Sequence, residues 1–404
     1  MIDDAVIDDT VINDTGGLLR GRDVVIISSI DWSDLWQAHQ EIASRLARSG
    51  SRVVYIENTG TRAPRFRDWR RVVRRLKAFL RARRAGGALH PAGRVLVVSP
   101  LILPPLGGRL RRLLNRLFVG WIARTLHHYG VRDPIVWTFL PTDTALDLYQ
   151  RLRTPASRLV YYCVADFPAH AAANKRIPHA EEALLKEAAV VFANVSELAA
   201  RIRRSNTNVH VFPVGVSLDA FTPGVPVAAA IRDLPRPRIG CIAELHNTKT
   251  DYAFLTALAR LRPKWTWIYV GPVEANVDFK SVPNVRLAGQ VPHRELASYI
   301  EGFDVCIVPY RQSEFMRTAV PTKINEYLAM AKPVVATPSI YAETVAAEGA
   351  ILVAPHEAGA FVKTIEAALE EDSDRQASRR RLFASRADWQ ERLAQMCAIV
   401  RGTL

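Results

Sequence analysis

Short runs of consecutive apolar residues alternate with segments of helical periodicity along most of the chain. Apolar runs that are rich in β-branched residues and bounded by polar ones predict buried strands. In the first half of the sequence they span residues 23–29, 52–58, 94–99, 134–139, 158–164, 189–194 and 209–212. In the second half they span residues 238–243, 266–271, 284–288, 304–309, 333–337 and 350–353.

Helical patterns fall between these runs, for example over residues 35–49, 142–152, 252–262 and 292–302. Strands that are apolar throughout and separated by helices predict a parallel sheet covered on both faces. Two such series predict an α/β protein made of two Rossmann-like, doubly wound domains. The length of 404 residues also fits two domains rather than one core.

The pattern also suggests where the domains begin and end. We expect residues 1–20 to be a disordered acidic N-terminus, residues 21–218 to be the first domain and residues 219–237 to be a linker rich in proline and small residues. The second domain is expected over residues 238–380. Residues 381–404 are expected to form a C-terminal helix that crosses back to the first domain, within a helical stretch from Gln376 whose apolar contacts include Leu382 and Trp389.

Composition is that of a globular protein, with 49% hydrophobic and 23% charged residues. The four cysteines are scattered and lie without C-x-x-C spacing, which indicates buried thiols in a reducing compartment. The acidic N-terminus lacks the basic region of a secretory signal, and no apolar run reaches the length of a membrane span. We therefore expect a cytoplasmic protein.

The net charge of +14 is concentrated in one segment. Basic residues crowd Arg62–Arg84, and apolar residues recur there at helical spacing, which is typical of a basic amphipathic helix on an anionic membrane. A second basic helix is expected around Arg112 and Arg116. Both apolar stripes could instead pack on the domain. Nucleic acid would use the same charge, but no nucleic-acid motif accompanies it.

The segment Val320–Thr337 carries the most specific chemistry. Pro321 and Thr322 predict a helix start, where free backbone N–H groups and the helix dipole favour an anion such as phosphate. Lys323 and Glu326 share a face one turn apart, so a cation for phosphates and a carboxylate for ribose hydroxyls stand together. The simpler interpretation is an ion pair on the solvated side of an amphipathic helix.

The pattern P-x-K-x-x-E-Y-L-A-x-x-K-P-V-V-A-T in this segment resembles the donor-site signature of family 4 (group 1) glycosyltransferases of bacterial surface polysaccharides. The resemblance implies the GT-B fold, in which two Rossmann-like domains face a central cleft. It also implies that Lys323 contacts phosphate and Glu326 holds the ribose. The family has a first Glu eight residues before the second, where Thr318 stands here. The stereochemical outcome of transfer is therefore not implied.

The same resemblance suggests further donor ligands. Lys249 matches a family lysine, but the accompanying arginine position holds Glu244, so phosphate contacts could shift to Arg311 or Arg317. Glycines that end apolar strands could let a nucleotide base approach the backbone. The candidate donor-binding residues are Lys249, Gly271, Gly289, Arg311, Thr322, Lys323, Glu326 and Tyr327.

Acceptor and catalytic candidates lie in the first half. The stretch from Asp31 through Trp32 and Trp36 resembles the N-terminal part of the same family, and the two aromatic rings could stack on a sugar or anchor the helix in the core. His39 and Asp166 are the catalytic candidates, although Asp166 could simply cap the next helix. No metal motif and no G-x-G-x-x-G turn is present, so no metal and no cofactor is expected.

Taken together, these features predict a glycosyltransferase that moves a sugar from a nucleotide-sugar donor to a cell-surface polysaccharide or lipid-linked glycan. Two alternatives stay open: a GT-B-like nucleotide-sugar epimerase or hydrolase, and a non-catalytic, basic membrane-binding adaptor. The donor base and sugar, the acceptor and the oligomeric state do not follow from the sequence.

Overall fold

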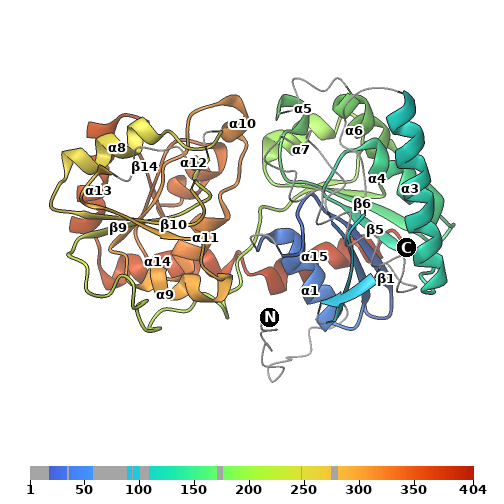
Figure 1. The fold of residues 1–404 in the computed structure, drawn as a ribbon, viewed down its shortest axis with the longest axis horizontal. Helices are drawn as coiled ribbons and strands as arrows, with labels where there is room; N and C mark the ends of the chain where they lie inside the picture. The colour runs from blue at the N-terminus through green and yellow to red at the C-terminus, as the bar shows by residue number, and fades with distance from the viewer. Residues whose placement is uncertain are drawn as a thin grey trace.

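The computed structural model describes residues 18–33, 36–57, 89–92, 94–100, 109–170, 176–246, 248–273 and 281–404. Two α/β units lie side by side, and each has a twisted sheet with helices on both faces (Figure 1). The predicted fold class of two Rossmann-like domains is confirmed. Residues 1–17 and the basic segment Arg62–Arg84 lie outside the described residues, so the structure does not test what the sequence predicts there.

The first sheet has the strand order β3-β4-β2-β1-β5-β6-β7-β8. Its strands are β1 (Asp23–Ile27), β2 (Arg52–Ile56), β3 (Leu89–Ala92), β4 (Val95–Val98), β5 (Ile135–Thr138), β6 (Arg158–Cys163), β7 (Val190–Ala193) and β8 (Val209–Val211). The predicted parallel arrangement holds except at β3, which pairs antiparallel with β4. Strand β3 was not predicted, because Pro91 interrupts it and an edge strand needs no continuous apolar run.

Helices cover both faces of this sheet. They are α1 (Ala38–Arg48), α3 (Arg109–His128), α4 (Asp143–Leu152), α5 (Phe167–His170), α6 (Arg176–Glu187) and α7 (Ser196–Ile202). Alternate side chains of the central strands enter two separate apolar clusters, one on each face. This two-sided burial explains why the strands read as continuous apolar runs.

The second sheet has the order β11-β10-β9-β12-β13-β14, and its pairs are parallel. Its strands are β9 (Arg238–Ile242), β10 (Thr266–Val270), β11 (Val285–Gly289), β12 (Val305–Val308), β13 (Val334–Ala336) and β14 (Leu352–Val353). Its helices are α8 (Tyr252–Leu261), η3 (His293–Glu295), α9 (Leu296–Glu301), α10 (Glu314–Arg317), α11 (Thr322–Ala329), α12 (Ile340–Ala347) and α13 (Ala358–Glu370).

The C-terminal stretch forms two helices, α14 (Asp374–Ser385) and α15 (Trp389–Arg401). Helix α14 packs on the second domain against α11, whereas α15 joins an apolar cluster of the first domain through Leu393 and its neighbours. The break between the helices lies where Val216 exchanges backbone hydrogen bonds with Ala387 and Trp389. The expected packing contact of Leu382 is wrong, since its side chain is 67% exposed on α14.

None of the helices in the described part of the chain is both long and apolar enough to span a membrane.

Candidate functional site

A cavity of about 580 Å³ lies between the two domains, at the carboxyl ends of their strands. Parallel α/β sheets bind ligands at this edge because the loops that follow the strands gather there. The first domain supplies Trp32, Ser33, Trp36, Gln37, Val164 and Ala165. The second domain supplies residues 242–244, Lys249, 270–272, 290–293, Leu296, Tyr310, Phe315, Met316 and 319–323.

Helix α11 begins at this cavity. Pro321 occupies the N-cap position and Thr322 is the first helical residue, as the sequence predicts. The Lys323 ammonium donates to both oxygens of the Glu326 carboxylate at 3.1 and 3.0 Å, so the expected pair on one face exists. The Lys323 side chain is 20% exposed and that of Glu326 is 8% exposed. The pair is therefore sheltered between the domains rather than on a solvated face.

Glu326 borders a second, smaller cavity of about 20 Å³, which has room for about one water molecule. This small cavity shares Trp36, Gln37, His293 and Thr322 with the large one. Burial lowers the pKa of His293, while the nearby Glu326 carboxylate opposes that shift. His293 is thus a neutral ring at the junction of the two cavities near neutral pH.

A second lysine reaches the large cavity from the loop after β9. The Lys249 ammonium lies 3.6 Å from the Glu244 carboxylate, and both side chains are nearly half exposed. Glu244 is the residue that replaces the arginine suggested by the family resemblance. Each of these two cavity lysines thus carries a carboxylate partner in this structure.

Gly271 follows β10 and has a φ of +137°, a conformation that favours glycine. A Cβ atom there would lie 2.1 Å from the Ala243 carbonyl oxygen. Glycine is required here because the ends of β9 and β10 approach each other closely at the wall of the cavity. The ends of both strands thereby form part of the cavity wall.

The opposite wall is aromatic. The Trp32 ring makes edge-on contacts with Tyr55 and Trp36, at 5.0 and 5.9 Å between ring centroids. The Trp36 ring in turn lies 6.2 Å from the imidazole of His293, across the gap between the domains. Both tryptophans border the cavity, so their faces are not fully used by the core.

His39 is a core residue, which contradicts its expected role in catalysis. It is 4% exposed, stacks on Phe139 at 3.7 Å between ring centroids, and shares a hydrogen bond of 2.7 Å with the Ser28 hydroxyl. Burial lowers the pKa of His39 to about 3. The ring is not part of the wall of the large cavity.

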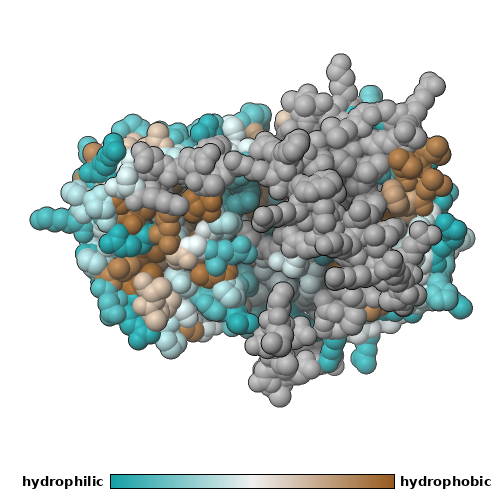
Figure 2. Space-filling model, viewed as in Figure 1, coloured by the Kyte–Doolittle hydropathy of each residue, from teal (hydrophilic) through white to brown (hydrophobic). Residues whose placement is uncertain are grey.

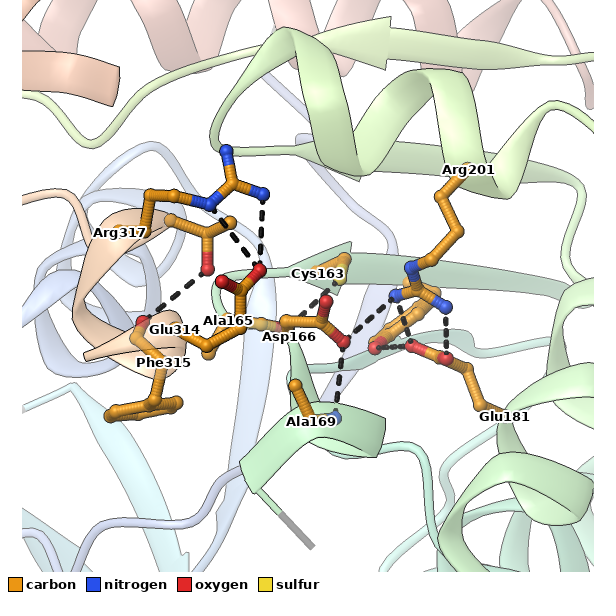
Figure 3. A network of polar contacts seen from close by, with 11 residues as sticks. Cys163, Ala165, Asp166, Ala169, Glu181, Arg201, Glu314, Phe315 and Arg317 are labelled. Atoms are coloured by element: carbon orange, nitrogen blue, oxygen red, sulfur yellow. Dashed lines mark hydrogen bonds and ion pairs between the residues drawn. The ribbon is translucent and has the colours of Figure 1, made fainter. Parts of the chain in front are cut away.

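Asp166 follows β6 but belongs to a polar network on the first domain (Figure 3). Its carboxylate accepts from the backbone N–H of Ala169 at 3.3 Å and lies 3.9 Å from the Arg201 guanidinium. Arg201 also holds the buried carboxylate of Glu181 at 2.6 Å. The interpretation of Asp166 as a helix cap fits this geometry better than a catalytic role, since Val164 and Ala165, not Asp166, border the cavity.

Besides Glu326, which borders only the small cavity, three other predicted donor residues do not border the large cavity. The Tyr327 hydroxyl is buried in the second domain and accepts from the Ile242 N–H at 2.7 Å. The guanidinium of Arg311 points to the Thr250 carbonyl, and Gly289 precedes the wall residue Gln290. On the acceptor side, the Asp31 carbonyl accepts from Gln40 at 3.4 Å, and Asp31 is likewise absent from the wall.

Thr318 and the nearest upstream carboxylate also lie apart from the cavity wall. Thr318 is 3% exposed and ends helix α10. The Glu314 carboxylate accepts from Arg317 at 3.1 Å, and its side chain is 73% exposed (Figure 3). Helix α10 therefore offers no carboxylate to the cavity in place of the family's first Glu.

Sequence reasoning missed two residues, His293 and Glu41. His293 begins the short helix η3 in a run that reads as polar surface, and the approach of the first domain places it at both cavities. Glu41 is a buried helix residue whose carboxylate accepts hydrogen bonds from three other side chains. Its position in an amphipathic helix does not predict these contacts. Within the described residues, no group of three or more His, Cys, Asp or Glu side chains could hold a metal ion.

Comparison with known proteins gives two kinds of likeness. Residues 236–371 match the family model for glycosyl transferases group 1. A Bacillus subtilis (strain 168) protein assigned to teichuronic acid biosynthesis as a glycosyltransferase is 29% identical over 148 residues. That match covers 35% of this chain and 37% of the relative, so it spans only about a third of either protein.

The likeness to solved structures covers almost the whole chain at low identity. Sucrose-phosphate synthase from Thermosynechococcus elongatus has a TM-score of 0.69 at 16% identity, over 94% of this chain and 98% of that one. Anabaena HepE in complex with UDP-glucose has a TM-score of 0.65 at 16% identity, over 95% and 100%. These are GT-B structures. The GT-B fold that the resemblance implied is thus confirmed, and residues 236–371 are similar to group 1 glycosyltransferases.

Proposed function

We propose that this protein transfers a sugar from a nucleotide-sugar donor to a cell-surface polysaccharide or lipid-linked glycan. The observation that carries the proposal is the N-terminus of helix α11, which opens into the cavity between the domains with Lys323 and Glu326 beside it. The group 1 domain match and the relative assigned to teichuronic acid biosynthesis support the same reaction class.

In this proposal the second domain binds the donor. Lys249, Lys323 and the positive end of the α11 dipole attract the diphosphate, which is the leaving group of the reaction. Glu326 accepts hydrogen bonds from the ribose hydroxyls, and the backbone beside Gly271 faces the base. The UDP-glucose complex of Anabaena HepE supports this class of donor.

The first domain presents the acceptor. Trp32 and Trp36 offer aromatic faces on which a sugar ring can stack, opposite the donor wall. A cavity closed from both sides excludes water, which would otherwise hydrolyse the donor. The proposed chemistry needs no cofactor, since the nucleotide sugar is itself a substrate.

We also propose that the protein lies peripherally on an anionic membrane, at its cytoplasmic face. Beyond the sequence of Arg62–Arg84, the support comes from helix α3. Leu113 and Leu117 are 57% and 60% exposed there, next to the exposed Arg112 and Arg116. Figure 2 shows a hydrophobic patch over this helix at the right of the view. Apolar and basic side chains on one exposed face are typical of helices at a lipid surface.

A thermal-shift screen tests the donor proposal. The probes are UDP, GDP, ADP and CDP, each alone and as its glucose conjugate. Because a ligand that binds the folded state stabilises it by about 2.7 kcal/mol at 100 times its Kd, one base should raise the melting temperature by several degrees. No shift with any of the four diphosphates would favour the adaptor. Consumption of a nucleotide sugar without acceptor, at the rate seen with it, would favour an epimerase or hydrolase.

A further inference from the structure

Glu41 lies in the first turn of α1 and is 6% exposed, yet it does not border the large cavity. Its carboxylate accepts three hydrogen bonds. The indole N–H of Trp36 donates to one oxygen at 2.7 Å. The Ser217 hydroxyl and the Arg45 Nε–H both donate to the other at 2.6 Å. One buried carboxylate thus joins an aromatic wall residue to the chain segment that leaves the first domain.

Ionisation of Glu41 is secured by these partners. Burial by itself raises the pKa of the carboxyl, but the charge of Arg45 and the hydrogen bonds from Ser217, Trp36 and Arg45 outweigh it and lower the pKa. The carboxylate is therefore charged at neutral pH. Charge-assisted hydrogen bonds of this kind are stronger than neutral ones and hold their donors in defined positions.

Arg45 also contacts both segments in which the chain passes between the domains, one near Ser217 and one before α15. Its guanidinium donates to the Ser217 hydroxyl at 2.9 Å and to the Gln390 side chain at 3.1 Å, and it lies 3.6 Å from Asp219. Ser217 belongs to the first segment that connects the domains, and Gln390 is the second residue of α15, just after the returning segment. Helix α1 is thereby attached to both chain segments that connect the two domains.

The donor helix is attached to the same crossing from the other side. Asn325, beside Glu326 on α11, donates to the Val214 carbonyl at 2.9 Å. The Tyr341 hydroxyl donates to the Asn325 side-chain oxygen at 2.8 Å and fixes the amide. Residues 214–217 therefore receive hydrogen bonds from the donor helix at one end and from the Glu41 network at the other.

We propose that Glu41 is a positioning residue, which holds Trp36 in the acceptor wall and fixes that wall to the interdomain crossing through Ser217. The inference rests on the proposed glycosyl transfer for the meaning of the wall. As a result, the face of the Trp36 ring lies opposite the donor site only when the segment that connects the domains has the conformation seen in this structure. Glu41 itself touches neither donor nor acceptor.

Spin labels measure the coupling without any turnover. The four native cysteines are buried, so cysteines placed at the exposed positions Lys186 and Leu382 label one domain each. In this labelled background, double electron–electron resonance gives the distribution of interdomain distances. Glu41→Gln and Ser217→Ala should each broaden it. Trp36→Phe, which keeps an aromatic ring but loses the indole N–H, should leave the distribution as in the unsubstituted protein. An unchanged distribution in Glu41→Gln would overturn the proposal.

Kinetics and calorimetry separate this inference from the proposed function. Loss of a hydrogen bond to a charged group corresponds to about a tenfold change in an equilibrium constant. Glu41→Gln should therefore raise the KM for acceptor about tenfold and leave the Kd for the nucleoside diphosphate within about twofold. In a Trp36→Phe background the effect on KM should shrink, since coupled residues are not additive.

The possible failures differ. A lower melting temperature together with an unchanged distance distribution and an unchanged KM for acceptor would reduce Glu41 to a structural role and overturn the inference. Absence of nucleoside diphosphate binding by the unsubstituted protein would instead overturn the proposed function, and the spin-label result would still stand by itself.

Discussion

At the scale of single residues, the pairing of lysines with carboxylates determines how strongly the cavity attracts an anionic ligand. Lys249 and Lys323 border the cavity, and Glu244 and Glu326 respectively compensate their charges. The two pairs differ in burial, because the Glu326 side chain is 8% exposed and the Glu244 side chain is 48% exposed. In the proposed complex the Glu326 carboxylate accepts hydrogen bonds from the ribose hydroxyls. The negative charge of Glu244, by contrast, repels the diphosphate.

Replacing Glu244 should therefore strengthen nucleotide binding. Exposed ion pairs are worth up to about 1 kcal/mol, so Glu244→Gln is expected to lower the Kd for the nucleoside diphosphate about two- to fivefold. Titration calorimetry at low and high salt measures this, and the gain should shrink at high salt because exposed charges are screened. Glu343→Gln, at an exposed position of α12 away from the cavity, is the matched control. Equal or weaker binding by Glu244→Gln would count against Lys249 as a phosphate ligand.

Individual side chains were predictable only in part. The i,i+3 spacing predicted the Lys323–Glu326 pair, because a helix places those positions on one face whatever surrounds it. His39 was assigned wrongly, since its type suggests chemistry while its neighbours Phe139 and Ser28 come from distant segments. The periodicity of α1 indicates its buried face, but only tertiary packing decides whether a polar residue on that face meets the core or a cavity.

At the scale of elements, local patterning was enough for most of the fold. Every apolar run interpreted as a strand is one in the structure, because two-sided burial demands side chains of that kind along the whole strand. The exception, β3, lies at the sheet edge with Pro91, where neither burial nor a full hydrogen-bond ladder is required. The helical pattern of the C-terminal stretch does not show the break between α14 and α15. That break lies where Val216 pairs with Ala387 and Trp389.

Helix α3 is the element on which the membrane proposal is testable. Flotation with vesicles of phosphatidylglycerol and phosphatidylcholine at moderate salt should carry the protein upward, and pure phosphatidylcholine should not. Leu113→Ser combined with Leu117→Ser should reduce the floated fraction severalfold, because each buried leucine contributes about 1.5–3 kcal/mol. The paired control is Leu382→Ser, an exposed leucine on α14 of the other domain. Equal flotation of all three proteins would remove α3 from the membrane face.

At the scale of the whole molecule, the site exists only because two sheets present their carboxyl edges to each other. The large cavity takes its aromatic wall from one domain and its cationic wall from the other. The resemblance predicted two domains that face a cleft but not which side chains meet there, since His293 and Trp36 are far apart in the chain and approach across the gap. The relation between the domains depends on residues 214–217 and the return through α15, whose hydrogen bonds join distant segments.

The most direct test of the account is the affinity of Glu326→Ala for the nucleoside diphosphate that stabilises the unsubstituted protein. The Glu326 side chain pairs with Lys323 and borders the small cavity, and within the described residues no side-chain hydrogen bond joins it to another element, so the melting temperature should change little. Titration calorimetry should show binding weakened about tenfold or more, with Glu314→Ala unchanged as the exposed control. Equal affinity of Glu326→Ala and the unsubstituted protein would contradict the assignment of the large cavity and the adjoining Glu326 to a nucleotide-sugar donor.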